Sequence, residues 1–175
     1  GKKLFYDGTL SRDGSISCAE CHNQAYAFTH HGHALSHGID DQVGTRNAPP
    51  LFNLAYHNSF FWDGGVKDLD FFHVAPITNP VEMDQDLGVL ISKLQHNATY
   101  VNLFKKAYGS EEITTDKFLK AISQFVLSLE SKNSKYDQYK AGKVSFSQSE
   151  KEGLALFESK GCSTCHKPPL FTDLS

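Results

Sequence analysis

Two short segments of this 175-residue chain repeat one arrangement, Cys-x-x-Cys-His. The first is CAECH at residues 18–22, and the second is CSTCH at residues 162–166. Together they use all four cysteines of the chain. The fold must therefore present each pair of thiols on one short turn, with an imidazole directly behind the second thiol.

This spacing is the c-type haem attachment motif. Two thiols can add to the two vinyl groups of one haem, and the histidine that follows can give the iron a nitrogen ligand. The sequence therefore predicts two covalently bound haem c groups. The residues expected to hold them are Cys18, Cys21, His22, Cys162, Cys165 and His166, with His22 and His166 as the iron ligands.

Three other interpretations of the cysteines explain less. The two pairs lie much farther apart in the chain than the pairs of a zinc ribbon. A thioredoxin-like motif needs a βαβ context, which the sequence does not show. A disulfide within either pair would close a poor structural loop. None of the three interpretations requires a histidine after each pair.

Composition excludes some classes of function. The net charge is −3 at pH 7, which gives no case for nucleic-acid binding. No run of 18 apolar residues is present, so we expect no membrane span. Covalent haem attachment is completed outside the cytoplasm, so we expect a periplasmic protein whose signal peptide is absent from this sequence.

Periodicity predicts a mainly α protein with long loops. Residues 1–83 are rich in loop-forming residues, apart from short helical turns near Leu4-Phe5 and Cys21-His22. Apolar residues then recur at helical spacing in residues 87–94 and 100–107. Gly109 is a natural stop for the second of these helices.

Later segments show helix boundaries of their own. Thr115 is expected to cap a longer amphipathic helix with apolar positions over residues 118–129. The polar residues 132–143 are interpreted as a connection between two haem units. Residues 147–150 have the form of a capping box that opens another helix, which Gly161 should end just before the second motif.

At these residues the chain resembles the bacterial di-haem cytochrome c peroxidases and the related MauG proteins. The resemblance covers nearly the whole chain and includes LFYDGTLSRDGSISCAECH, GTRNAPPLFNLAYHNSFFWDGG, PITNPVEM and SEKEGLALFESKGCSTCH. It implies two cytochrome c-like domains, which we expect at residues 1–134 and 135–175. The first haem would react with peroxide, and the second would take in electrons.

Three residues match the family at catalytic positions. Trp62 matches the tryptophan that couples the two haems, although it could be an ordinary core aromatic. Pro76 and Glu82 match the distal-side proline and glutamate of the peroxide haem. A carboxyl beside an open haem face can move protons between the peroxide oxygens, whereas the alternative for Glu82 is a surface carboxylate after a proline turn.

Two further matches concern metals. Asn47 matches an asparagine that gives one oxygen to calcium, or it is simply a turn-forming residue. Many members carry a switchable distal histidine in the loop after the first motif. The corresponding position in this chain falls near residues 39–41, which contain no histidine. His37 lies close by and is the candidate iron ligand, while His30, His31 and His33 precede it. Such a histidine-rich loop could equally bind adventitious metal or be solvated.

The chain also departs from the family pattern. Gly65 stands where the family often has arginine, and Phe72 where it often has glutamine. These changes would alter the hydrogen bonds of the distal pocket. We also expect an unfinished second haem pocket, because few residues follow His166 and the only methionine, Met83, lies in the first haem segment.

The function expected from the resemblance is reduction of hydrogen peroxide to water. The electrons would come from a small soluble donor such as a cytochrome c or a cupredoxin, and the protein could be a homodimer. Two alternatives remain: MauG-like oxidation of a partner protein, and electron transfer without catalysis by a di-haem carrier.

Overall fold

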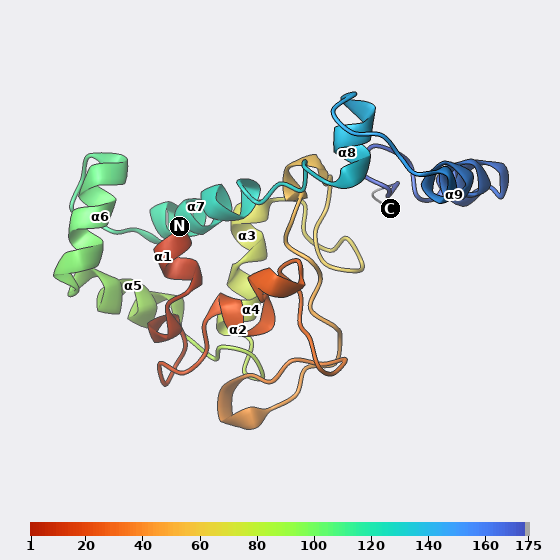
Figure 1. Cartoon of the computed structure of the whole chain (residues 1–175). Coiled ribbons are helices and arrows are strands. Elements are labelled where there is room, and N and C mark those ends of the chain that lie inside the picture. Colours follow the sequence, from red (N-terminus) through yellow and green to blue (C-terminus); the bar gives the residue numbers. More distant parts are fainter. Residues whose placement is uncertain (174–175) are drawn as a thin grey trace. The chain divides into compact units, whose positions relative to one another are not determined.

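The structure is a computed structural model of the chain, and it describes residues 1–173 (Figure 1). Backbone contacts divide it into two compact units, Gly1–Leu129 and Glu130–Ser175. The prediction of a mainly α protein is confirmed: within residues 1–173 the only β pairings are isolated bridges, such as that between His37 and Val43. The assignment of residues 1–134 and 135–175 to two haem domains stays a prediction.

The helices of the first unit are short before residue 87 and longer after it. They are α1 Lys2–Phe5, α2 Cys18–Cys21, α3 Leu69–Phe72, α4 Val74–Thr78, α5 Leu87–Gln95, α6 Ala98–Tyr108 and α7 Thr115–Leu127. Short 3₁₀ turns occur at Gly8–Leu10, Gln24–Tyr26, Ile39–Asp41 and Leu54–Tyr56. The sequence missed α3 and α4, because each is too short to show a helical period.

Capping residues set the ends of the longer helices. Asp86 and Asn97 cap α5 and α6 by accepting backbone N–H groups, and α6 ends at Gly109 with φ of 72°. The predicted cap of α7 was wrong by one residue. Thr114, in extended conformation, accepts the N–H of Lys117, and Thr115 is already helical.

Helix α7 is the centre of the hydrophobic core, and it packs against α1, α3 and α5. Its buried face carries Phe118, Ile122 and Val126. Burying a side chain of this size contributes about 1.5–3 kcal/mol relative to leaving it exposed. Met83 is also buried in this core, so it belongs to the first unit and to its packing.

The second unit contains α8 Lys135–Lys140, α9 Gln148–Ser159 and a 3₁₀ turn at Cys162–Thr164. The segment predicted to be a polar connection therefore contains a helix, which Ser134 and Asp137 begin with a capping box. The capping box predicted at Ser147 and Glu150 is confirmed. The predicted stop at Gly161 is close, since α9 ends at Ser159 and Gly161 has φ of 78°.

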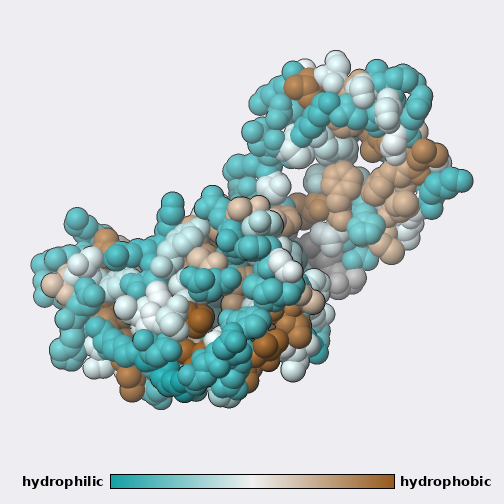
Figure 2. All heavy atoms as spheres, turned by 60° about the horizontal axis from the view of Figure 1, so that its bottom comes forward, coloured by the Kyte–Doolittle hydropathy of each residue, from teal (hydrophilic) through white to brown (hydrophobic). Residues whose placement is uncertain are grey.

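The second unit has no buried core of its own in the part that the structure describes. No side chain of residues 130–173 is buried. Its apolar contacts are ring pairs, such as Phe171 against Tyr136 and Phe157. In Figure 2 this smaller unit, at the upper right, has an open space through its middle. Residues 130–173 therefore do not bury the second motif by themselves.

Candidate functional site

The first Cys-x-x-Cys-His motif lies on one turn of helix. Helix α2 runs from Cys18 to Cys21 and ends at His22, whose N–H donates to the carbonyl oxygen of Cys18 over 2.9 Å. Residues three apart share one face of a helix. The two thiols therefore lie on one side of α2, as attachment to one porphyrin edge requires.

The ring of His22 is oriented by the backbone. Its Nδ1 lies 2.8 Å from the carbonyl oxygen of Phe28, which makes Nδ1 the donor and leaves Nε2 unprotonated. Burial lowers the pKa of His22, so the ring stays neutral. A neutral imidazole whose second nitrogen donates to a carbonyl is the usual form of a histidine that binds metal.

Two adjoining cavities lie beside this histidine. The smaller is largely apolar and is lined by Cys18, Phe5, Leu51, Ile77, Ile122 and Val126, among others. The larger has a volume of about 340 Å³. The residues that line both are Cys21, His22, Phe72, Pro76 and Glu82. Apolar walls with a few convergent polar groups are typical of a cofactor site.

The residues around these cavities fit a haem. Burial raises the pKa of Cys18 to about 12 and also raises the pKa of Cys21, so both thiols stay neutral in an apolar setting. Cys18 lines the apolar cavity, and Nε2 of His22 is available for iron. Thioether bonds to Cys18 and Cys21 would remove both thiols and fill the apolar slot.

Glu82 contributes a carboxyl to both cavities. It follows α4 in the turn after Pro80, and its Oε1 accepts a hydrogen bond from Nδ2 of Asn79 over 2.7 Å. Burial raises the pKa of Glu82, while the amide of Asn79 acts in the opposite direction. The structure therefore places Pro76 and Glu82 in the same hollow as His22, although their catalytic roles stay predictions.

The loop after the first motif is anchored to the segment that carries Glu82. The N–H of Ile39 donates to the carbonyl oxygen of Glu82 over 2.8 Å, and Ile39 is fully buried. Arg12 joins the two segments, because it contacts Asp40 at 2.6 Å and Asp84 at 2.5 Å. Residues 39–41, which stand where many family members have the distal histidine, thus hold the backbone of this loop in place.

His37 is exposed and lines the larger cavity. Its Nδ1 lies 2.5 Å from Oδ1 of Asp41, so its ring is held by the loop. This position beside the cavity is compatible with a switchable iron ligand, but that role stays a prediction.

Trp62 and Asn47 line the same larger cavity. The Nε1 of Trp62 donates to the carbonyl oxygen of Asn47 over 2.8 Å. Nδ2 of Asn47 in turn donates to the carbonyl oxygen of Ala34 over 2.7 Å. Within the first unit Trp62 is 61% exposed, so it is not a core aromatic. A calcium ligand at Asn47 stays a prediction.

His73, which no sequence motif indicated as a site residue, lines the smaller cavity. This residue joins α3 to α4, is 6% exposed, and places Nε2 3.1 Å from Oγ of Ser123 on α7. Burial, and then His22, lower its pKa to about 4. In the sequence, only the position of His73 three residues before Pro76 could have suggested a place in the site, because His73 belongs to no recognised motif.

The second motif repeats the local geometry of the first. The N–H of His166 donates to the carbonyl oxygen of Cys162 over 2.9 Å. Nδ1 of His166 lies 3.1 Å from the carbonyl oxygen of Phe171. Cys162, Cys165 and His166 are all exposed within residues 130–173. The turn that carries the motif is therefore formed, while residues 130–173 do not bury it by themselves.

Comparisons with known proteins agree with this geometry. A family profile described as "Di-haem cytochrome c peroxidase" matches residues 1–145. The chain is 39% identical over 170 residues to a cytochrome c551 peroxidase of Nitrosomonas europaea, covering 97% of this chain and 51% of that protein. It is 37% identical over 182 residues to the methylamine utilization protein MauG of Methylorubrum extorquens, covering 99% of this chain and 50% of that protein.

A solved structure agrees as well. The crystal structure of a MauG-like protein associated with microbial copper homeostasis superposes with a TM-score of 0.88 at 29% identity, covering 99% of this chain and 53% of that one. The chain thus spans about half the length of the curated relatives that it matches. With the family profile matched from residue 1 to residue 145, this chain belongs to the di-haem cytochrome c peroxidase family.

Proposed function

We propose that the protein containing this chain reduces hydrogen peroxide to water, at a haem held by Cys18, Cys21 and His22. The observation that carries this proposal is the position of Glu82. Its carboxyl lines the same cavities as His22, and burial raises its pKa. A carboxyl with a raised pKa beside an iron ligand is suited to proton transfer during peroxide reduction.

The protein's own groups would do the following. His22 would hold the iron through Nε2 while Nδ1 donates to Phe28. Glu82 would take a proton from one peroxide oxygen and deliver it to the other, with Asn79 fixing its orientation. Haem c, when bound, supplies the electron-transfer chemistry, so that peroxide with two electrons and two protons gives two waters.

Electrons would reach this site from the second haem, at Cys162, Cys165 and His166. Trp62 is the residue proposed to couple the two haems, and Pro76 is proposed to shape the peroxide side of the first. In this scheme residues 1–134 form the peroxide-reacting domain, and residues 135–175 begin the domain that takes in electrons. The donor would be a small soluble redox protein such as a cytochrome c or a cupredoxin.

Other proposed features follow from the family and the motifs. Covalent attachment of haem c implies the periplasm, and no helix in residues 1–173 is long and apolar enough to cross a membrane. Asn47 would give one oxygen to calcium. His37 would be the switchable iron ligand, and a homodimer is the proposed assembly.

A second candidate function is oxidation of a partner protein, as in a MauG-like enzyme. The relative named MauG at 37% identity favours this alternative. The third candidate, an electron carrier without catalysis, is opposed by the carboxyl of Glu82 in the haem cavity.

Peroxide turnover by the full-length di-haem protein with a chemical reductant separates these functions. We expect multiple turnovers, together with a high-spin ferric haem signal once the reductant has released His37 from the iron, because an open iron position is needed for peroxide. A high-spin signal without turnover would favour the MauG-like function. Two low-spin haems and no turnover would leave only the carrier.

A further inference from the structure

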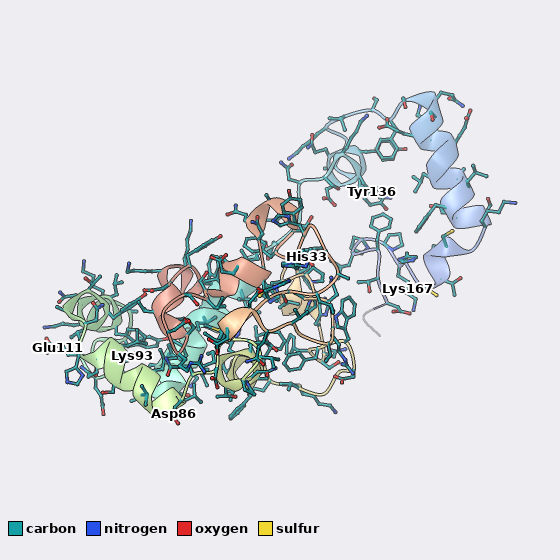
Figure 3. All side chains as sticks on the ribbon, turned by 90° about the horizontal axis from the view of Figure 1, so that it is seen from below. His33, Asp86, Lys93, Glu111, Tyr136 and Lys167 are labelled. Atoms are coloured by element: carbon teal, nitrogen blue, oxygen red, sulfur yellow. The ribbon has the colours of Figure 1, made fainter. Side chains whose placement is uncertain are left out.

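Four histidines gather in the loop between α2 and α3, outside the proposed proton-transfer machinery. They are His30, His31, His33 and His37, and Figure 3 labels His33 on this loop. The ring centroids of His30 and His33 lie 4.5 Å apart, and those of His33 and His37 lie 4.9 Å apart. The fourth ring, that of His31, stacks on Tyr26 at 3.9 Å and lies 6.0 Å from the ring of His30.

The protein backbone and one carboxylate fix which nitrogens of this cluster are available. Nδ1 of His33 lies 2.6 Å from the carbonyl oxygen of Leu35, so it carries the proton and leaves Nε2 with its lone pair. Nδ1 of His37 is likewise engaged by Asp41. Histidines that bind metal almost always have their other nitrogen tied to a carbonyl or carboxylate in this way.

The distance between two of these nitrogens matches a metal site. Nε2 of His30 lies 3.4 Å from Nε2 of His33. Two nitrogens bound to one tetrahedral zinc, each at about 2.0–2.1 Å, are separated by about 3.4 Å. The first two ligands of a site are therefore already at the required spacing.

We propose that His30, His33 and His37 form a binding site for one divalent transition metal ion of the kind that prefers imidazole, such as Zn²⁺ or Cu²⁺. Among residues 1–173 no three metal-binding side chains converge on one point as the structure stands. His30 and His33 are the preformed pair, and the exposed His37 completes the site by turning its Nε2 toward them.

Metal binding at this site would hold His37 away from the haem cavity that this residue lines.

Zinc binding to the tag-free, full-length holoprotein tests this inference. Equilibrium dialysis against Zn²⁺ in excess Ca²⁺ should show one tight site. His30→Gln, His33→Gln and His37→Gln should each weaken that site at least about tenfold, since even indirect losses at metal sites cost 10–100-fold. His31→Gln, in the same loop, and His96→Gln, on α5's C-terminal end, are the matched controls and should bind as the wild type does.

Three outcomes would overturn the proposal. These are no tight site in the wild type, equal weakening in the two controls, or unchanged affinity in any one of the three ligand variants. Unchanged haem content and an unchanged far-UV circular dichroism spectrum in every variant show that each has folded, so a loss of zinc is read as a loss of ligand. The measurement does not depend on peroxide turnover, and failure of either proposal leaves the other standing.

Discussion

His22 donates from Nδ1 to the carbonyl oxygen of Phe28 over 2.8 Å, and this bond fixes the orientation of the ring. His166 stands in the same relation to Phe171 at 3.1 Å. Both motifs therefore hold the histidine by a bond of the same kind, and the first histidine lines a cavity. The shared geometry makes haem stoichiometry the first quantity to measure.

We expect two thioether-linked haems per chain when the full-length protein is produced in a host that exports it and attaches haem. Replacing Cys18 and Cys21 together by serine should reduce the count to one, and so should replacing Cys162 and Cys165. A pyridine haemochrome assay with a haem-stained denaturing gel reports both numbers. Intact thiols and no thioether-linked haem in the wild type would refute haem attachment.

The functional importance of Glu82 is tested by Glu82→Gln in the full-length enzyme. This change keeps the size of the side chain and removes its titratable proton. We expect peroxide turnover to fall by about 10²-fold or more with haem content unchanged, which is the usual scale of general acid–base catalysis. Glu112→Gln, an exposed carboxyl outside the cavity, is the control. Equal turnover in wild type and Glu82→Gln would show that Glu82 has no part in proton transfer.

How much of this site was predictable differs between residues. The candidate haem-attachment residues could be named from the sequence, because covalent attachment imposes a short spacing on Cys18, Cys21 and His22 that few other functions share. Pro76 and Glu82 required the family resemblance, since a proline and a carboxylate in a turn have many uses. The contact of Asn79 with Glu82 and the burial of His73 were not predictable. They depend on how α4 and α7 pack, and local sequence does not encode that packing.

The helices show the same distinction. Helices α5, α6 and α7 are long enough to show an apolar period, and their existence was predicted correctly. Helices α3, α4 and α8 have four to six residues. Their stability depends on tertiary contacts and capping, because isolated helices of this length do not persist in water. A periodic pattern cannot reveal such segments.

Asn79→Ala should change the pH profile of peroxide turnover. Burial raises the pKa of Glu82, and the hydrogen bond from Asn79 opposes that shift by stabilising the carboxylate. If the carboxylate is the base in the free enzyme, kcat/KM falls as pH drops through this pKa. Removing the amide raises the pKa further, so the acid limb should move to higher pH. An acid limb that stays in place, or moves to lower pH, would contradict this account.

Gly38→Ala should destabilise the loop that is anchored beside Glu82. A Cβ atom at this position would lie 2.5 Å from the carbonyl oxygen of Glu82 and closer still to that of Val81. We expect a loss of about 1–3 kcal/mol, typical of overpacking, seen as a lower Tm of the holoprotein. Gly44→Ala is the control in the same loop, because its Cβ would meet no atom closer than 4.0 Å. Equal Tm values for both variants would show that the loop gives way freely.

His73→Leu should reduce the loss of stability that acid causes. The unfolded chain takes up a proton at His73 below about pH 6.5, whereas the folded protein holds the ring neutral until about pH 4 because burial and His22 lower its pKa. The contribution is therefore fully present above pH 6.5 and is lost as pH falls toward 4. A shift of this size corresponds to about 3 kcal/mol. The Tm of wild type and variant, measured at pH 7 and near pH 4.5, gives the two differences.

The control for this prediction is Ser123→Ala, which removes the buried hydroxyl 3.1 Å from Nε2 of His73 and keeps the titrating ring. Its Tm should still fall with acid at least as much as that of the wild type. In His73→Leu the buried hydroxyl of Ser123 loses this partner, which lowers stability at every pH by about 1–3 kcal/mol. The diagnostic quantity is therefore the change in Tm between the two pH values. Equal changes in wild type and His73→Leu would mean that His73 is already protonated, or open to water, in the folded protein.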